Sequence, residues 1–149
     1  MDYVSERAAA VNAWEALFRA QVSVLQQLHA EFPTGEISLN EYDVLFNLSR
    51  QPGHQLRLRD LNKHLLLTQP SISRLVDRLT VRGLLRKEAD QHDGRGTIVC
   101  LTDAGYALFR SVAIPHSESI VRQMASLTPQ ELARLTELTD KLRHGLDRP

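Results

Sequence analysis

Apolar residues recur at every third or fourth position through the first part of the chain. The series is Val4, Ala8, Val11, Trp14, Phe18, Val22, Leu25, Leu28 and Phe32. Because this spacing places the side chains on one helical face, it predicts a single long amphipathic helix over 4–32. Pro33 and Gly35 then end the helix. The stripe runs for about eight turns, so it carries more apolar surface than a small domain covers by itself.

Shorter helices are predicted in the next fifty residues. Ser38 and Glu41 form a capping box, in which each side chain satisfies the other's backbone N–H group at the start of a helix. The stretch 56–65 places leucines on one face of a short helix. A further helix is predicted with Thr68 as its N-cap and proline in its first turn, where proline is tolerated. Gly83 suits the left-handed C-cap of that helix.

The pattern then shifts from helical to strand spacing. Residues 84–88 and 97–101 are short segments, the second rich in β-branched residues, and the polar loop 89–96 between them contains two glycines, which predicts a β-hairpin. A second long helix is predicted from 102–105 to about Ser126, with a kink at Pro115. A second capping box at 128–131 opens a last helix. Its apolar stripe is Leu132, Leu135, Leu138, Leu142 and Leu146.

This order of elements predicts a mostly α (α+β) protein of one domain, 1–149. Helix, short helix, tight turn, helix and β-hairpin make a winged helix-turn-helix lobe over 37–101. The long helices of 1–34 plus 102–149 form a separate helical region. A second copy of the chain is the commonest way to cover such apolar stripes, so we expect this region to dimerise. Packing within a monomer is the alternative.

Net charge is zero, with 18 Lys/Arg and 18 Asp/Glu, but the charges are unevenly placed. Residues 50–100 hold ten bases and five acids, a net charge of +5, and the rest of the chain carries −5. Such an asymmetry favours one anion-binding module between acidic flanks. Chance clustering of solvated surface charges is the alternative on charge alone.

Polar and basic side chains remain on the helix predicted after Thr68 once its apolar stripe is buried. Small and amide side chains near a helix N-terminus can meet base edges in the major groove, and arginines one turn apart can hold phosphates or guanine. The predicted DNA-contacting residues of this segment are Gln69, Pro70, Ser71, Ser73, Arg74 and Arg78. Arg74 and Arg78 could instead be solvated partners of Asp77.

The hairpin loop places one arginine at its tip. Arg95 lies between Gly94 and Gly96, with Asp93 two residues earlier. An arginine on a thin protrusion beside a recognition helix suits insertion into a narrow minor groove, and Asp93 is expected to orient the guanidinium. A flexible surface arginine in a turn is the alternative.

The segment 56–105 resembles the winged helix-turn-helix of the MarR family of bacterial transcription regulators. The specific parts are SRLVDRL…RGLL, the D-x-x-D-x-R wing and the V-x-LT-x-x-G that follows. The resemblance implies a homodimer in which each module reads half of a palindromic double-stranded DNA operator. Many members carry arginine at the third wing position, where this chain has His92, and the resemblance places His92 among the wing contacts.

The same resemblance implies that a small phenolic or anionic effector binds between the dimer helices and the winged module and releases the DNA. Its candidate contacts are Trp14, Tyr42, Asp43, Phe46 and His116. Trp14 could instead belong to a dimer core, and Asp43 could lie on a helix surface or in a salt bridge. The resulting expectation is a repressor of its own or a neighbouring gene.

Other classes of protein find little support in the sequence. The motifs GxGxxG, GxxxxGK[ST], HExxH and GxSxG are absent, so we expect neither an enzyme nor a cofactor. No metal site is expected, since His116 and Glu118 do not share a helix face. The single cysteine, Cys100, suits a small buried hydrophobe and fits a reducing cytoplasm, and no apolar run is long enough to cross a membrane. A winged-helix adaptor that binds protein rather than DNA is the alternative function.

Overall fold

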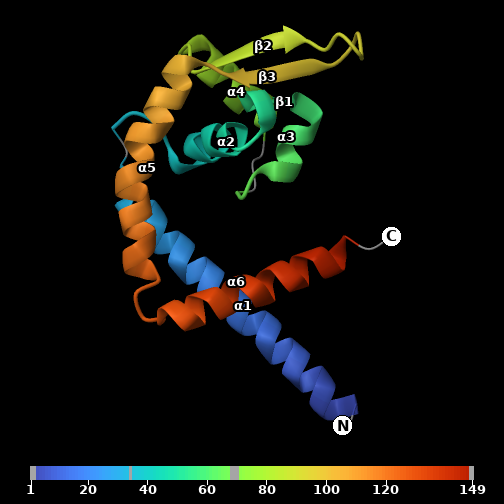
Figure 1. The fold of residues 1–149 in the computed structure, drawn as a ribbon, viewed down its shortest axis with the longest axis vertical. Coiled ribbons are helices and arrows are strands. Elements are labelled where there is room, and N and C mark those ends of the chain that lie inside the picture. Colours follow the sequence, from blue (N-terminus) through green and yellow to red (C-terminus); the bar gives the residue numbers. More distant parts are fainter. Residues whose placement is uncertain (1–2, 34, 68–70, 148–149) are drawn as a thin grey trace. The chain divides into compact units, whose positions relative to one another are not determined.

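The computed structural model describes residues 3–33, 35–67 and 71–147 of the 149-residue chain (Figure 1). In this part of the chain the elements follow the order α1 (Tyr3–Glu31), α2 (Leu39–Ser49), the 3-10 helix η1 (Pro52–His54), β1 (Gln55–Arg57), α3 (Leu58–His64), α4 (Ile72–Val81), β2 (Leu85–Ala89), β3 (Thr97–Leu101), α5 (Asp103–Gln123) and α6 (Pro129–Leu146). The predicted class, mostly α with a winged helix-turn-helix and long terminal helices, is confirmed.

The chain divides into two compact units. Residues 32–116 form one, and 1–31 with 117–149 form the other. The first unit extends beyond the predicted lobe 37–101, because the first part of α5 packs with the winged module. Val112 is buried there, and the ring of His116 lies 5.2 Å from that of Phe32. We call 32–116 the winged unit and the remainder the helical unit.

The winged unit has a continuous aliphatic core. Its helix α2 begins at the predicted capping box, with Ser38 and Glu41 each accepting the other's backbone N–H group. The core residues come from all three helices of the helix-turn-helix and from the sheet. They include Val44, Leu45, Leu48, Leu61, Leu75, Val76, Leu79, Leu85 and Val99.

The sheet contains a strand that the sequence pattern did not reveal. In the described residues it has three antiparallel strands in the order β1-β3-β2. Strand β1 occupies the first part of the segment predicted as helix 56–65, so that helix, α3, begins only at Leu58. Three residues are too few to show alternation, and β1 exists because β3 supplies its backbone partners, with Arg57 opposite Ile98.

Helix α4 begins later than predicted. Its N-cap is Ser71, whose hydroxyl accepts the backbone N–H of Arg74 at 3.4 Å, rather than Thr68, which lies outside the described residues. Its end is as predicted, because Gly83 has φ +76 and completes a double hydrogen-bonded cap. In this cap Gly83 N–H donates to the carbonyl of Thr80 and Leu84 N–H to that of Leu79, both at 3.0 Å.

The helical unit leaves apolar side chains exposed. Helix α1 has no buried residue in this chain, and α6 opens at the predicted Thr128–Glu131 capping box. Glu31 at the end of α1 joins α5 by accepting from Ser119, Arg122 and Gln123. Helix α5 continues through Pro115 and ends at Gln123, three residues before the predicted Ser126. Among the described residues no helix is long and apolar enough to span a bilayer.

An apolar groove of about 950 Å³ runs between the two helices of this unit. We call it the α1–α6 groove. Its lining includes Ala13, Trp14, Leu17, Leu135, Leu138 and Leu142.

Candidate nucleic-acid interface

The exposed face of α4 carries the polar residues predicted to contact DNA. Ser73, Arg74 and Arg78 are exposed, while Leu75 and Leu79 of the same helix are buried. Ser71 is half-buried and its hydroxyl is engaged in capping, so it is the residue before the helix rather than part of its first turn. The predicted contacts Gln69 and Pro70 lie outside the described residues.

Asp77 does not neutralise the arginines of α4. Its carboxylate forms an ion pair with Lys87 of strand β2. Within the described ranges neither Arg74 nor Arg78 has a carboxylate at ion-pair distance. The alternative that Asp77 pairs with these two arginines is therefore wrong, and α4 presents two uncompensated guanidinium groups.

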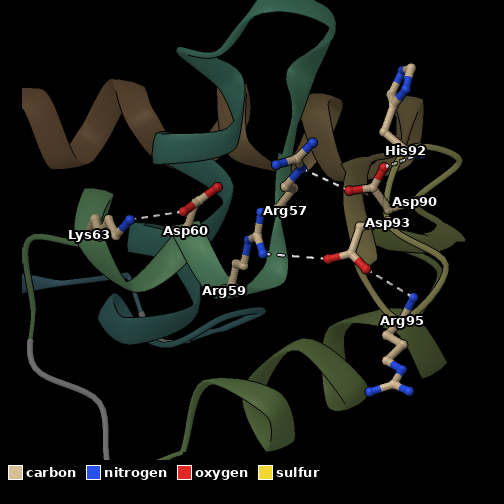
Figure 2. Close-up of polar contacts among 8 residues, drawn as sticks. All are labelled: Arg57, Arg59, Asp60, Lys63, Asp90, His92, Asp93 and Arg95. Atoms are coloured by element: carbon tan, nitrogen blue, oxygen red, sulfur yellow. Dashed lines mark hydrogen bonds and ion pairs between the residues drawn. The ribbon is translucent and has the colours of Figure 1, made fainter.

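The wing is the hairpin of β2 and β3 with its connecting loop, and Arg95 projects from that loop (Figure 2). The sequence led us to expect that Asp93 orients the Arg95 guanidinium, and this expectation is wrong. Asp93 Oδ1 accepts the backbone N–H of Arg95 at 3.3 Å, and its Oδ2 lies 3.5 Å from Nη1 of Arg59. The guanidinium of Arg95 points away from Asp93, and the ring of His92 points away from the carboxylates as well (Figure 2).

Most bases of residues 50–100 have an acidic partner. The ion-paired ones are Arg57, Arg59, Lys63, Arg82, Arg86 and Lys87. Of the other four, Arg50 lies over the ring of Phe46 at 5.8 Å. The remaining three, without an acidic partner in the part of the chain that the structure describes, are Arg74, Arg78 and Arg95. The excess positive charge of this segment is therefore concentrated on α4 and the wing tip.

Arg57 and Asp90, which join the wing to strand β1, were not predicted from the sequence. Arg57 Nε lies 2.8 Å from Oδ2 of Asp90, whose side chain is only 1% exposed. The backbone N–H of His92 and the charge of Arg57 lower the pKa of Asp90 below its ordinary value. Asp90 is the first residue of the D-x-x-D-x-R motif, but its partner is 33 positions earlier on an unpredicted strand, so no local pattern pointed to the pair.

Known proteins share this arrangement. Residues 36–96 match the model of the MarR family. A MarR family transcriptional regulator from Streptomyces coelicolor, Sco3205, solved in complex with DNA, is 26% identical with a TM-score of 0.78, covering 95% of this chain and 89% of that one. AbsC, a MarR family regulator from the same organism, is 27% identical with a TM-score of 0.76 over 90% and 91%. Residues 36–96 are thus similar to the MarR family, and the chain shares the fold of these two regulators.

A third relative shows the same fold at lower identity. BpsR of Bordetella bronchiseptica, whose DNA binding is regulated by 6-hydroxynicotinic acid, is 23% identical with a TM-score of 0.76 over 89% of this chain and 98% of that one. MarR-family proteins are transcription regulators and not enzymes. The family match over 36–96 and the two regulators from Streptomyces coelicolor support a DNA-binding regulator, the function expected from the sequence.

Three of the predicted effector contacts meet in one aromatic cluster of the winged unit. The ring of Tyr42 lies 4.9 Å from that of His116 and 6.2 Å from that of Phe46. Phe32 and Phe109 complete the cluster. Trp14 lies in the helical unit, where it stacks on Phe18 and lines the α1–α6 groove. Tyr42 and His116 are buried, and burial raises the pKa of Tyr42.

Asp43 supports the turn that leads to α4. Its carboxylate is buried and accepts the backbone N–H groups of Leu66 and Leu67, at 3.2 and 2.8 Å, and the side-chain amide of Asn47 at 2.8 Å. Burial raises the pKa of Asp43 in spite of these hydrogen bonds. The structure thus shows a buried hydrogen-bonding role, rather than the surface or salt-bridge role considered as the alternative to effector binding.

Two further expectations from the sequence concern Cys100 and metal binding. Cys100 is buried in β3, as predicted, and burial raises the pKa of its thiol. The described ranges contain no group of His, Cys, Asp and Glu side chains that could hold a metal ion.

His116 is expected to make the protein less stable as the pH falls below neutrality. Burial lowers its pKa below the ordinary 6.5, and its Nδ1 has no hydrogen-bond partner in the described structure. The unfolded chain therefore takes up a proton near pH 6.5 that the folded state resists, so stability is lost as the pH falls from above 6.5 through the folded-state pKa. The carboxyl groups with lowered pKa values, Glu31, Asp60 and Asp90, lose their contribution only at lower pH.

The measurement is urea unfolding between pH 7.5 and about pH 5. His116→Phe, which keeps an aromatic ring against Phe32 and Tyr42, should flatten the decline over this range. His144→Phe, at an exposed position of α6, should keep the wild-type profile. If the unfolding free energy of His116→Phe falls with pH as steeply as that of the wild type, another group causes the acid sensitivity.

Proposed function

We propose that this protein is a MarR-family regulator, a homodimer that binds a palindromic operator through α4 and the wing. The observation that carries the proposal is the distribution of unpaired charge. Among the residues that the structure describes, Arg74, Arg78 and Arg95 lack acidic partners, whereas six neighbouring bases are ion-paired. Ser73 and Arg74 read base edges in the major groove, Arg78 holds a phosphate, and Arg95 enters the minor groove. Gln69, Pro70, Ser71 and His92 complete the proposed contacts.

The exposed apolar surface of the helical unit supports a homodimer. Trp14 is 63% exposed and Leu138 46% exposed in the single chain, and both line the α1–α6 groove. Leaving such a continuous apolar surface in water is unfavourable, and a two-fold partner would present the same helices to it. The dimer would place two winged units on successive half-sites of an inverted repeat.

Selection from a random pool of DNA duplexes at near-physiological salt tests the proposal, because phosphate attraction alone is weak under those conditions. Enrichment of an inverted repeat is the expected result. Failure of a folded dimer to enrich any sequence would instead favour the winged-helix adaptor that binds protein.

Removal of the wing arginine should weaken binding to the selected duplex. Arg95→Ala is expected to cost about 1–3 kcal/mol of binding free energy while the protein remains folded and dimeric. Fluorescence anisotropy titrations at several salt concentrations provide the measurement. Wild-type affinity in this variant would exclude the wing from the interface.

The aromatic cluster around Tyr42 supports an effector site. Stacked and edge-on rings with one buried histidine suit a planar aromatic ligand, and Arg50 beside Phe46 supplies a positive charge for an anionic group. We propose that an aromatic acid bound beside Tyr42, Phe46 and His116 releases the operator, so that the protein acts as a repressor of its own or a neighbouring gene. Trp14 and Asp43 remain further candidate contacts.

A direct test is the release of the selected duplex by 6-hydroxynicotinate, salicylate and 4-hydroxybenzoate. Release that is lost in Phe46→Ala supports this site. Release that persists unchanged in this variant contradicts it.

A further inference from the structure

The loop that carries Arg95 is folded around two carboxylates. Asp90 N–H donates to the carbonyl of Gly96 at 3.0 Å, and Gly96 N–H donates to the carbonyl of Asp93 at 2.8 Å. Asp90 Oδ1 accepts the N–H of His92, and Asp93 Oδ1 accepts the N–H of Arg95. The backbone from which the Arg95 side chain projects is therefore held by the carboxylates of Asp90 and Asp93.

Two arginines of an adjacent segment face these carboxylates (Figure 2). Arg57, the last residue of β1, pairs with Asp90 at 2.8 Å, and Arg59, in the first turn of α3, pairs with Asp93 at 3.5 Å. The two contacts differ in strength. The Asp93 pair is long and both side chains are well exposed, so it contributes little. The Asp90 pair is short and buries its carboxylate almost completely.

The Asp90 carboxylate depends on Arg57 for one of its two oxygens. Oδ1 accepts the His92 N–H group, whereas Oδ2 has no hydrogen bond in the described structure and lies 2.8 Å from Nε of Arg57. A buried carboxylate that loses its counter-charge is strongly unfavourable. Without Arg57, Asp90 is expected to move toward water, and the loop hydrogen bonds at His92 and Gly96 would break.

The net charge of the wing loop also points to a role for Arg57. The loop 89–96 contains two acids and one base, so by itself it is net negative and would be repelled by phosphates. Arg57 and Arg59 neutralise both acids from outside the loop. The positive charge of Arg95 is then the uncompensated charge of the wing tip.

We propose that Arg57 is a positioning residue for DNA binding, which holds Asp90 and thereby fixes the wing from which Arg95 reaches the DNA. Arg57 acts through Arg95 and makes no DNA contact of its own. The inference rests on the proposed DNA-binding role of the wing.

The decisive experiment is a double-mutant cycle on the selected duplex. Arg57→Ala should weaken binding about tenfold, within the range for loss of one wing contact. In the Arg95→Ala background the same change should have no further effect. A loss that persists undiminished in that background would show that Arg57 contacts DNA directly, which overturns the proposal.

Arg82 provides a matched control. Its side chain is 39% exposed, as is that of Arg57, and it is also ion-paired, but it joins α4 to Glu41 and the carbonyl of Glu36. Arg82→Ala removes the same charge but none of the contacts of the wing, so the hydrogen bonds of the wing loop should be kept. Arg57→Lys, which keeps a charge beside Asp90, should recover part of the lost affinity. Full recovery in Arg57→Lys together with an equal loss in Arg82→Ala would mean that net charge alone matters, which overturns the proposal.

Electrostatic attraction alone and positioning of the wing predict opposite effects of Asp90→Asn on DNA affinity. Removing an acid near DNA should strengthen binding if only electrostatic attraction operates. If Asp90 and Arg57 together position the wing, Asp90→Asn should weaken binding. Tighter binding by this variant would overturn the proposal.

Hydrogen exchange provides a readout that does not depend on DNA. The amides of His92 and Gly96 should exchange at least about tenfold faster in Arg57→Ala, while the α2 amides and the thermal unfolding transition confirm that the fold is kept. Arg82→Ala should leave these two amides unchanged. Unchanged wing exchange in Arg57→Ala would overturn the positioning role by itself, whereas failure of the wild type to select any duplex would overturn the proposed function.

Discussion

Leu138→Glu is expected to convert the protein from a dimer to a monomer and to weaken binding to the selected inverted repeat by about 100-fold or more. Leu138 lies in α6 and lines the α1–α6 groove with Leu17 and Leu142. A glutamate there would place an unpaired charge in the proposed apolar interface, which is strongly unfavourable. The affinity falls steeply because a monomer holds one half-site and loses the high local concentration of the second winged unit.

Light scattering after size exclusion measures the mass, which should fall to the 16.9 kDa of a single chain. The fold should survive, because the Leu138 side chain is 46% exposed in the single chain and glutamate is a good helix former. Leu138→Met keeps the apolar surface and should remain dimeric with wild-type affinity. A wild-type protein that is already monomeric, or a Leu138→Glu variant that stays dimeric, would contradict the proposed interface.

Gly105→Ala should destabilise the winged unit by about 3 kcal/mol of unfolding free energy. A Cβ atom at this position would lie 2.1 Å from the carbonyl oxygen of Leu84 and 2.8 Å from a methyl carbon of Leu101. The carbonyl cannot easily withdraw, because it accepts the N–H of Thr102 at 3.2 Å. Thr102 Oγ1 accepts the N–H of Gly105 itself and donates to the carbonyl of Gly83, so the clash disturbs the junction of α4, the wing and α5.

Helix propensity acts in the opposite direction and is smaller. Alanine is favoured over glycine in a helix by about 1 kcal/mol, which does not offset overlap with a backbone oxygen. Gly145 in α6 allows helix propensity to be measured without a clash, since nothing lies within 4 Å of a Cβ atom there. Gly145→Ala should therefore stabilise the protein slightly. Urea unfolding of both variants provides the measurement, and a stabilised Gly105→Ala would show that the junction can open without cost.

Local patterns in the sequence determined most of the elements of this protein. The capping boxes at Ser38 and Thr128 and the left-handed cap at Gly83 join residues a few positions apart, and the strands of the β-hairpin pair across 8 to 16 positions. Interactions of this range are encoded in short stretches of chain, because backbone geometry and the nearest side chains decide them. The family motifs also lie in one continuous segment, so the winged fold and its DNA-binding class could be predicted.

Tertiary structure decided the features that join distant segments. Strand β1 forms because β3 pairs with it, and α4 begins at Ile72 with Ser71 as its N-cap, although an earlier cap was predicted. Asp43 supports the turn 23 and 24 residues later in the chain, and Arg57 meets the wing at Asp90. A carboxylate or guanidinium has no preferred partner until folding brings one near it. For that reason the sequence identified the charges of the interface, and only the packed structure distinguished the arginines that hold the wing from those left to bind DNA.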